Sequence, residues 1–206
     1  MPPGPDAVHR HGRRQGPGLT RVELLRADRL LLRHWSESDL AAFFGLYSLQ
    51  DVARWLGPHS RRPLATRAEA RDRLRRWHDR ERGLRAPLGL WAMVPLAAGA
   101  QPGEPVGTLL LLPLSDGVGP TGLVEVGWHL HPGHQGRGLA TEAARAVLAK
   151  AGEAGIDQVL ALTDLDNVAS KRVAARLDMR DEGVTDRWFG LTTRQYRGIV
   201  PPGSPP

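Results

Sequence analysis

A glycine-rich segment between a strand-like run and a helix-like run constrains the fold of this chain more than any other feature. The segment Gln135 to Ala140 reads QGRGLA. Before it, Leu123 to His131 has the β-branched and aromatic content of a strand, and after it Thr141 to Lys150 is an Ala-rich helical stretch. The sequence therefore predicts a strand, a tight turn and a helix in direct succession.

The composition of this turn indicates an anion-binding loop. Gly136 and Gly138 remove the Cβ atoms that would keep a ligand away from the backbone. The first amides of the following helix are free, and the helix dipole favours negative charge there. The chain has no GxxxxGK[ST] string, and its glycines lack the GxGxxG spacing. What remains is the pattern [Gln/Arg]-x-x-Gly-x-[Gly/Ala], formed by Gln135, Gly138 and Ala140, and a ligand-free turn is the alternative interpretation.

This pattern resembles the pyrophosphate loop of the GNAT-superfamily N-acetyltransferases. Four other segments follow the superfamily's order and spacing: EVGW at 125–128, ATEA at 140–143, DNVAS at 166–170 and RLDM at 176–179. Near the start, RLLLR at 29–33 followed by Ser38-Asp39-Leu40 is similar to the Rim-type (RimJ/RimL-like) branch. The resemblance covers roughly residues 25 to 200. The RLDM segment departs from the family pattern at Asp178, where glycine is usual, and at Met179, where phenylalanine is usual.

The resemblance and the residue patterns predict a single α/β (α+β) domain. We expect a mixed, mostly antiparallel sheet flanked by helices, with a splay between the fourth and fifth strands. Strands are expected at 29–34, 90–94, 106–112, 123–131, 158–163, 180–187 and 193–200, and helices at about 36–48, 66–82, 141–150 and 167–177, with a helical turn at 51–56. The domain is expected to span 19–200, between a disordered basic tail at 1–18 and a disordered tail at 201–206.

The family resemblance implies acetyl-CoA as the cosubstrate, with no metal. It implies that backbone groups of the fourth strand hold the pantetheine arm, that the loop amides hold the pyrophosphate, and that Asn167 and Ser170 lie near the arm and its sulfur end. The cofactor-binding residues expected in this way are Trp128, His129, Leu130, Gln135, Gly136, Arg137, Gly138, Leu139, Ala140, Thr141, Asn167 and Ser170.

Acetyl transfer to an amine requires a proton acceptor and stabilisation of the leaving thiolate. Glu125 is the first candidate for the base, because a carboxylate within a sheet is costly unless it is hydrogen-bonded or used. His129 lies on the same strand face and is the second candidate. Many family members place a tyrosine where this chain has Ala174, so Ser170, a water or no group at all protonates the thiolate. Helix capping is the alternative role for Ser170 and Asn167. For Glu125 the alternative is a structural carboxylate partnered by a neighbouring arginine or a backbone amide.

The acceptor pocket is predicted less sharply. Trp55, Trp91 and Trp188 are candidates for lining it, although core packing is the commoner role of a tryptophan. His129, His131 and His134 have a spacing that can suit zinc, but no cysteine accompanies them, and we expect no metal site.

The charge of the chain leaves a second class of function open. The net charge is +6 and the isoelectric point is near 10.8, so a basic RNA- or ribosome-binding module without catalysis is the alternative. Arginines alternate with acidic residues, however, which is typical of a solvated face rather than a nucleic-acid surface. We expect a cytoplasmic protein with no signal peptide and no membrane span. The acceptor is either a small-molecule amine or a protein N-terminus, and the sequence leaves both a monomer and a homodimer open.

Overall fold

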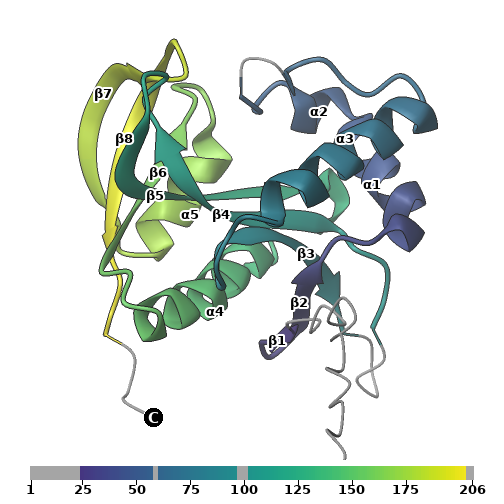
Figure 1. Cartoon of the computed structure of the whole chain (residues 1–206), viewed down its shortest axis with the longest axis horizontal. Helices are drawn as coiled ribbons and strands as arrows, with labels where there is room; N and C mark the ends of the chain where they lie inside the picture. The colour runs from purple at the N-terminus through teal and green to yellow at the C-terminus, as the bar shows by residue number, and fades with distance from the viewer. Residues whose placement is uncertain (1–23, 58–59, 97–101, 203–206) are drawn as a thin grey trace, which may run out of the picture.

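The computed structural model describes residues 24–57, 60–96 and 102–202, which form one sheet with helices on both faces (Figure 1). The strands are β1 (Leu24–Arg26), β2 (Leu30–His34), β3 (Gly89–Pro95), β4 (Gly107–Ser115), β5 (Pro120–Leu130), β6 (Gln158–Thr163), β7 (Arg180–Trp188) and β8 (Leu191–Ile199). The α-helices are α1 (Leu40–Tyr47), α2 (Gln50–Ala53), α3 (Arg67–Glu81), α4 (Leu139–Glu153) and α5 (Val168–Arg176), with 3-10 turns η1 (Glu37–Asp39) and η3 (Pro132–His134).

The sheet has eight strands in the order β1-β2-β3-β4-β5-β6-β8-β7. Every neighbouring pair is antiparallel except β5 and β6, which are parallel. The β5–β6 ladder is limited to one residue pair, Glu125 and Leu160, whereas β5 pairs with β4 along most of its length. The predicted fold class is therefore confirmed, including the splay between the expected fourth and fifth strands.

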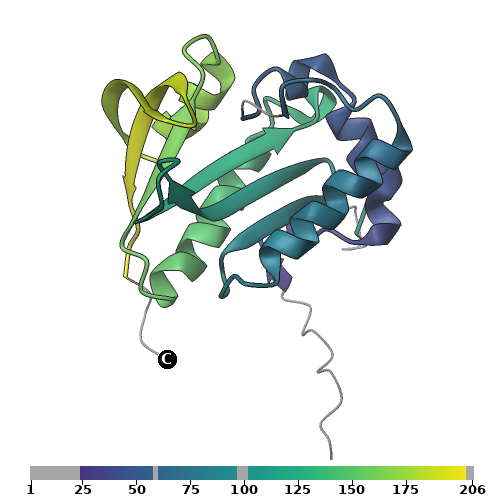
Figure 2. The same ribbon diagram turned by 45° about the horizontal axis from the view of Figure 1, so that its top comes forward.

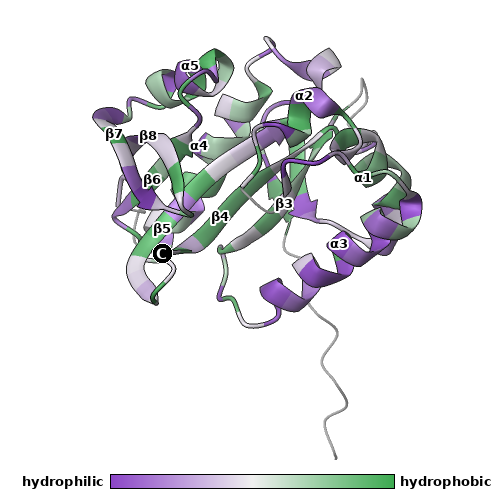
Figure 3. Cartoon of the chain, turned by 90° about the horizontal axis from the view of Figure 1, so that it is seen from above, coloured by the Kyte–Doolittle hydropathy of each residue, from purple (hydrophilic) through white to green (hydrophobic). Residues whose placement is uncertain are grey.

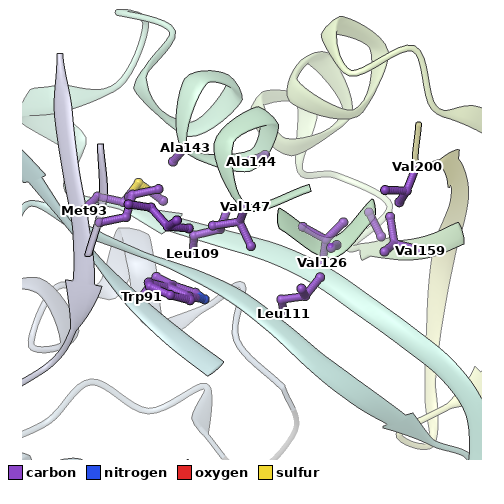
Figure 4. Packing of buried hydrophobic residues seen from close by; sticks show 14 of the residues in the cluster. Trp91, Met93, Leu109, Leu111, Val126, Ala143, Ala144, Val147, Val159 and Val200 are labelled. Carbon is purple, nitrogen blue, oxygen red and sulfur yellow. The ribbon is translucent and has the colours of Figure 1, made fainter. Parts of the chain in front are cut away.

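The two faces of the sheet carry separate cores, as the alternation of β3 shows. Trp91 and Met93 pack toward α4, whereas Ala92 and Val94 belong to the cluster under α1 and α3. Figure 2 shows α3 lying along the sheet, and Figure 4 shows Ala143, Ala144 and Val147 of α4 over Met93 and Leu109. Because β3 is buried on both faces, it is apolar throughout, while α3 is largely hydrophilic (Figure 3).

Local sequence signals explain several element boundaries. The Thr66 hydroxyl accepts a hydrogen bond from the Glu69 amide at 3.2 Å and so caps α3. Asp178 follows α5 with φ of 55°, in the left-handed conformation that explains why glycine is usual at this position and that aspartate tolerates better than most residues. Strand β1 was not predicted, because three residues are too short to show an alternating pattern.

Some predictions fall on residues outside the described ranges. The tail at 1–18 lies wholly outside them, as do residues 203–206 of the second tail. Pro201 and Pro202 are described, and both are exposed. No helix in the described part of the chain is long and apolar enough to cross a membrane.

Candidate functional site

The loop after β5 has the backbone conformation that its two glycines make possible. Gly136 and Gly138 have φ of 75° and 77°, in the left-handed region that L side chains rarely adopt, and Gly138 is the N-cap of α4. A Cβ added at Gly136 would meet no atom within 4 Å, and one at Gly138 only Arg29 Nη2 at 3.6 Å. Backbone conformation, rather than lack of space within the protein, therefore requires glycine at both positions.

Arg29, at the edge of β2, fixes this loop from outside. Its Nη1 donates to the Arg137 carbonyl at 3.0 Å, and its Nη2 is 2.6 Å from Glu142 Oε2. Its backbone N–H also donates to Glu142 Oε1 at 2.7 Å. A residue 108 positions earlier in the sequence thus holds the first turn of α4 and the loop together.

The last residues of β5 direct backbone groups into the splay. His131 N–H donates to the Val106 carbonyl at 2.8 Å, and the register continues with Leu130 opposite Gly107. Hydrogen-bonded and non-hydrogen-bonded pairs alternate in an antiparallel ladder, so the backbone groups of Trp128 and Leu130 point away from β4, toward β6. The Gln135 side chain occupies one of them, because its Nε2 donates to the Leu130 carbonyl at 3.0 Å.

These elements enclose a cavity of about 560 Å³, which we call the loop cavity. Most of the predicted cofactor-binding residues line it: Trp128, His129, Leu130, Gln135, Gly136, Gly138, Leu139, Ala140, Thr141, Asn167 and Ser170. Arg137 is the exception, since it lines the neighbouring cavity together with Arg29. The structure therefore brings together residues that the sequence spreads from the end of β5 to the start of α5.

The polar groups of the loop cavity suit a phosphate-bearing ligand. The Thr141 hydroxyl is buried and has no hydrogen-bond partner within the described ranges, although it lies in the first turn of α4. Arg172 and Arg176, one turn apart on α5, line the same cavity and bring positive charge to it. A buried hydroxyl, two arginines and a helix N-terminus are groups that could hold an anion.

The start of α5 closes the cavity at the splay. Asn167 caps the helix, because its Oδ1 accepts from the Ser170 amide at 3.1 Å. Ser170 is not the cap; its Oγ accepts from the Trp128 indole at 3.2 Å, which leaves its own O–H free to donate. Ala174, at the position where a tyrosine is common, is fully buried and presents no polar group.

A second cavity of about 280 Å³, the Glu125 cavity, lies on the α3 side of the sheet and shares five residues with the loop cavity: Trp55, Trp128, His129, Asn167 and Ser170. Glu125 lines only this second cavity and has no hydrogen bond or ion pair with any described residue. Burial raises the pKa of Glu125 to about 7, partly opposed by the charge of Arg80. Among the described residues, neither an arginine nor a backbone amide partners Glu125 as the structural alternative expects.

His129 lies further along the same strand, and its ring is part of a buried chain of hydrogen bonds. Tyr47 OH lies 3.0 Å from His129 Nδ1 and 2.7 Å from Thr108 Oγ1, which also accepts from the Trp35 indole at 3.1 Å. Burial lowers the pKa of His129 to about 4, so the imidazole is neutral at pH 7. Tyr47 and Thr108 were not singled out from the sequence, because they lie on other elements and pair with His129 only in the fold.

The burial of Trp91 and Trp188 contradicts the prediction that they line the acceptor pocket. Trp91 is fully buried in the core and stacks on His34, and Trp188 is 1% exposed in a small cluster with Leu114 and Leu160. Neither lines the Glu125 cavity, because both side chains are enclosed by their own core clusters. Trp55 does line it, with Arg54 stacked 4.5 Å from its ring centroid.

The histidines give no metal cluster in this arrangement. Among residues 24–57, 60–96 and 102–202, no group of three or more His, Cys, Asp or Glu side chains is placed to hold an ion. His131 Nδ1 instead accepts from the Gly133 amide at 3.1 Å and shapes the turn before the loop.

An eight-stranded mixed sheet with a splay and a glycine loop at that splay are the features expected of an acetyltransferase fold. The chain belongs to the acetyltransferase (GNAT) domain family, whose model matches residues 29–180. A curated relative, the uncharacterized N-acetyltransferase YnaD of Bacillus subtilis (strain 168), is 37% identical over 60 residues. That alignment covers 29% of this chain and 35% of the relative, about a third of its length.

Solved structures of acetyltransferases have a similar fold over most of this chain. A putative GnaT-family acetyltransferase from Bordetella pertussis is 26% identical, with a TM-score of 0.65 over 85% of this chain and 99% of that one. A putative ribosomal-protein-serine acetyltransferase from Vibrio cholerae has a TM-score of 0.70 at 16% identity, over 88% and 99% of the two chains. RimL, the ribosomal L7/L12 alpha-N-protein acetyltransferase solved in complex with coenzyme A, has a TM-score of 0.67 at 18% identity. The match covers 86% of this chain and 98% of RimL. The similar folds thus include the Rim-type branch that the N-terminal motif resembles.

Proposed function

We propose that this protein is an acetyl-CoA-dependent N-acetyltransferase that moves the acetyl group directly to a primary amine. The observation that carries the proposal is the meeting of the two cavities at five shared residues. One cavity has an anion-binding loop, and the other has a carboxyl group with a pKa near neutrality. The family match favours this activity over the alternative of a non-catalytic RNA-binding module.

The loop cavity is the proposed donor site. The amides from Gln135 to Ala140, with the Thr141 hydroxyl, would hold the pyrophosphate, and the backbone of Trp128 and Leu130 would hold the arm of the cofactor. RimL, which has the same fold, was solved in complex with coenzyme A, and this supports the assignment. When bound, acetyl-CoA supplies the acetyl group as a thioester whose carbonyl carbon the amine attacks, with release of the CoA thiol.

Glu125 is the proposed general base, directly or through a water. A base is most effective when its pKa lies near the working pH, and the pKa of Glu125 is about 7. The pKa of His129 is about 4, three units below that of Glu125, so its affinity for a proton is roughly a thousand times lower. Its neutral ring, held by Tyr47, instead forms part of the wall between the two cavities.

Ser170 is the proposed donor of a proton to the leaving thiolate. Its hydroxyl borders both cavities, and its oxygen already accepts from Trp128, so its own proton can be directed elsewhere. No covalent intermediate on cysteine can form, because the chain contains no cysteine. Transfer is therefore proposed to occur in a single complex of donor and acceptor.

The acceptor is proposed to be either a protein N-terminus or a small-molecule amine, in the cytoplasm. The two ribosomal-protein acetyltransferases among the similar structures motivate the first class. The limited volume of the Glu125 cavity motivates the second. Both classes present a primary amine that must lose a proton before attack.

The proposal is tested first by binding and then by turnover. Acetyl-CoA at 100 times its dissociation constant stabilises the fold by about 2.7 kcal/mol, which a thermal melt detects. An amine panel is then screened for release of free thiol from acetyl-CoA. Absence of any thermal shift at millimolar acetyl-CoA, together with salt-sensitive binding to RNA, would contradict the proposal.

A further inference from the structure

Helix α3 presents two arginines to the Glu125 cavity. Arg73, Trp77 and Arg80 are spaced by four and three residues, so they share one face of the helix, and all three line the cavity. A third arginine, Arg61, reaches the same cavity from the segment before α3. Three guanidinium groups thus surround a space that also contains the proposed base.

Only one of these three arginines has a carboxylate partner among the residues that the structure describes. Arg61 Nη2 lies 3.1 Å from Asp164 Oδ2, another residue of the cavity wall. Within the same described ranges, neither half-buried Arg73 nor exposed Arg80 has an ion pair or hydrogen bond, whereas Arg75 of α3 pairs with Asp72. The described chain therefore leaves these two cations without a hydrogen-bonded carboxylate, and Glu125, in the same cavity, interacts with Arg80 only through its charge.

Arg73 is the stronger observation, because part of its guanidinium is out of reach of solvent. Its Nη1 is buried without a hydrogen-bond partner among the described residues, and its guanidinium carbon lies 5.7 Å from the centroid of the Tyr47 ring. Burial lowers the pKa of Arg73, as expected for a cation without a counter-ion. A buried donor left unpaired is unfavourable, and a bound acceptor of hydrogen bonds would satisfy it.

The opposite wall of the cavity also has unpaired polar groups. Thr163 on β6 and Thr193 on β8 are 4% and 5% exposed, and both hydroxyls lack a hydrogen-bond partner within the described ranges. Both residues line the Glu125 cavity. Buried hydroxyls are normally satisfied, so these two groups also indicate a polar ligand in this cavity.

We infer that the acceptor is a small amine that also carries an oxyanion, a carboxylate or a phosphate, bound by Arg73 and Arg80 while its amino group faces Glu125. This inference rests on the proposed function and names its substrate class. Guanidinium groups bind such oxyanions through two parallel hydrogen bonds. A polyamine would instead bring positive charge against both arginines.

The size and the remaining lining of the cavity favour an amino acid over a protein segment. The volume of about 280 Å³ lies at the lower limit of small-molecule pockets. Trp55, Trp77 and Phe189 supply apolar surface. Phe189 has φ of 57° because it and Gly190 form the two-residue turn between β7 and β8, and this turn places its side chain at the cavity. An apolar amino acid matches this combination of walls.

The test compares acceptors with and without the oxyanion, and kcat/KM is expressed per unprotonated amine because loss of the oxyanion also lowers the pKa of the amino group. Thiol release from saturating acetyl-CoA is measured with leucine against leucinamide, and with phosphoethanolamine against ethanolamine. We expect kcat/KM to be about 10- to 100-fold higher for the leucine or the phosphoethanolamine member of its pair, the range expected for one or two charge-assisted hydrogen bonds. The pair that shows the larger ratio identifies carboxylate or phosphate as the recognised group.

The arginines are then removed one at a time. Arg73→Gln and Arg80→Gln should each reduce that ratio toward 1 by raising KM, whereas Arg71→Gln, an exposed arginine of α3 that does not line the cavity, should leave it unchanged. Thermal melts with and without acetyl-CoA show that each variant folds and binds the donor. Equal ratios in Arg73→Gln and wild type would overturn the inference, as would preferred turnover of leucinamide, spermidine or a neutral peptide N-terminus.

Failure of the proposed function has a different signature. If acetyl-CoA gave neither a thermal shift nor thiol release with any amine, the acetyltransferase proposal would fail. Calorimetric titration of leucine and leucinamide into the same protein would still decide the anion site. If the protein bound leucine but not leucinamide, and Arg73→Gln lost this binding, the oxyanion site would be supported. Equal affinity for leucine and leucinamide would refute it.

Discussion

The loop cavity and the Glu125 cavity share a wall but are built from different parts of the chain. The loop cavity depends on backbone conformation at two left-handed glycines, at the N-terminus of α4 and on the free side of β5, and side chains complete its lining. The Glu125 cavity is formed by side chains that come from α3, β5, β6 and β8. A backbone site can be described by a short sequence pattern, whereas a side-chain site depends on residues that only the fold brings together.

The electrostatics of the two cavities differ in the same way. In the loop cavity the positive potential arises from a helix terminus and from arginines on α5, and it suits a ligand common to a whole family. In the Glu125 cavity it arises from the two arginines of α3 that lack a described partner, beside a carboxyl of raised pKa. The first arrangement suits a shared donor, and the second can change from one acceptor to another by substitution of a few side chains.

The largest effect is expected at Glu125, and it separates the two cavities functionally. Glu125→Gln should lower kcat by about 10² to 10⁴ at pH 7.5, because the base is lost. Its affinity for acetyl-CoA should not change, because Glu125 does not line the loop cavity. In wild type, kcat/KM should rise as the pH passes through about 7, where the carboxyl of the free protein ionises. Glu104→Gln, at an exposed position, is the matched control.

An unaltered pH-rate profile in Glu125→Gln would remove Glu125 from the mechanism. A loss of acetyl-CoA affinity equal to the loss of kcat would show instead that the two cavities are not separate.

The role of the loop in acetyl-CoA binding is tested by two separate glycine-to-valine substitutions, one at each end of α4. Gly138→Val should weaken acetyl-CoA binding by at least about tenfold, because a β-branched residue at φ of 77° costs roughly 1–3 kcal/mol and shifts the loop amides. Gly155 has φ of 80° and lies just after the other end of the helix. Gly155→Val should lose similar stability in a thermal melt and retain its affinity. Equal affinities in the two variants would contradict the assignment of the loop.

Stability is expected to change in the opposite direction from activity at Glu125. The pKa of this carboxyl is raised from 4.5 in the unfolded chain to about 7 in the fold. The protonated carboxyl's contribution to the free energy of unfolding is therefore fully present below pH 4.5 and is lost as the pH rises through 7. Glu125→Gln should exceed wild type in free energy of unfolding by about 1–3 kcal/mol at about pH 8.5, and the advantage should shrink as the pH falls toward the unfolded pKa. Denaturant titrations at both ends of this range measure it, and an advantage independent of pH would contradict the raised pKa.

The smallest effect is expected at the loop anchor. Arg29→Gln removes an ion pair with Glu142 whose two side chains are 55% and 15% exposed, so it should cost only about 0.5–1 kcal/mol and weaken acetyl-CoA binding about two- to fivefold. Arg75→Gln, which removes an exposed pair with Asp72, should leave the affinity unchanged. Calorimetry with acetyl-CoA distinguishes these outcomes. A tenfold or larger loss in Arg29→Gln would place Arg29 in direct contact with the ligand.

The sequence predicts most of the fold and most of the loop cavity, because both depend on local rules. Left-handed turns need glycine, strands alternate, and α3 begins where Thr66 can cap it. The same reasoning fails for Trp91 and Trp188, since a tryptophan in a strand has the same local pattern whether it faces a core or a cavity.

The Glu125 cavity was only partly predictable for the same reason. Its contacts join residues far apart in the chain, such as Arg61 with Asp164, 103 positions later, and Tyr47 with His129, 82 positions later. That Arg73 and Arg80 lack described partners cannot be inferred from a sequence rich in both charges. The nearest available signal is the spacing of arginines around Trp77 on α3.

Strand β5 lies in the interior of the sheet, but its ladder with β6 is short. Beyond that ladder, the backbone groups on its β6 side are unpaired with a strand, as they are in an edge strand. Its residues should therefore differ in hydrogen exchange within a single strand: amides that pair with β4 exchange slowly, and those of Trp128 and Leu130 exchange fast. A ligand that extends along this open side would act as a short additional strand and slow the second set alone. Such an alternating pattern of protection would report occupancy residue by residue, without any measurement of turnover.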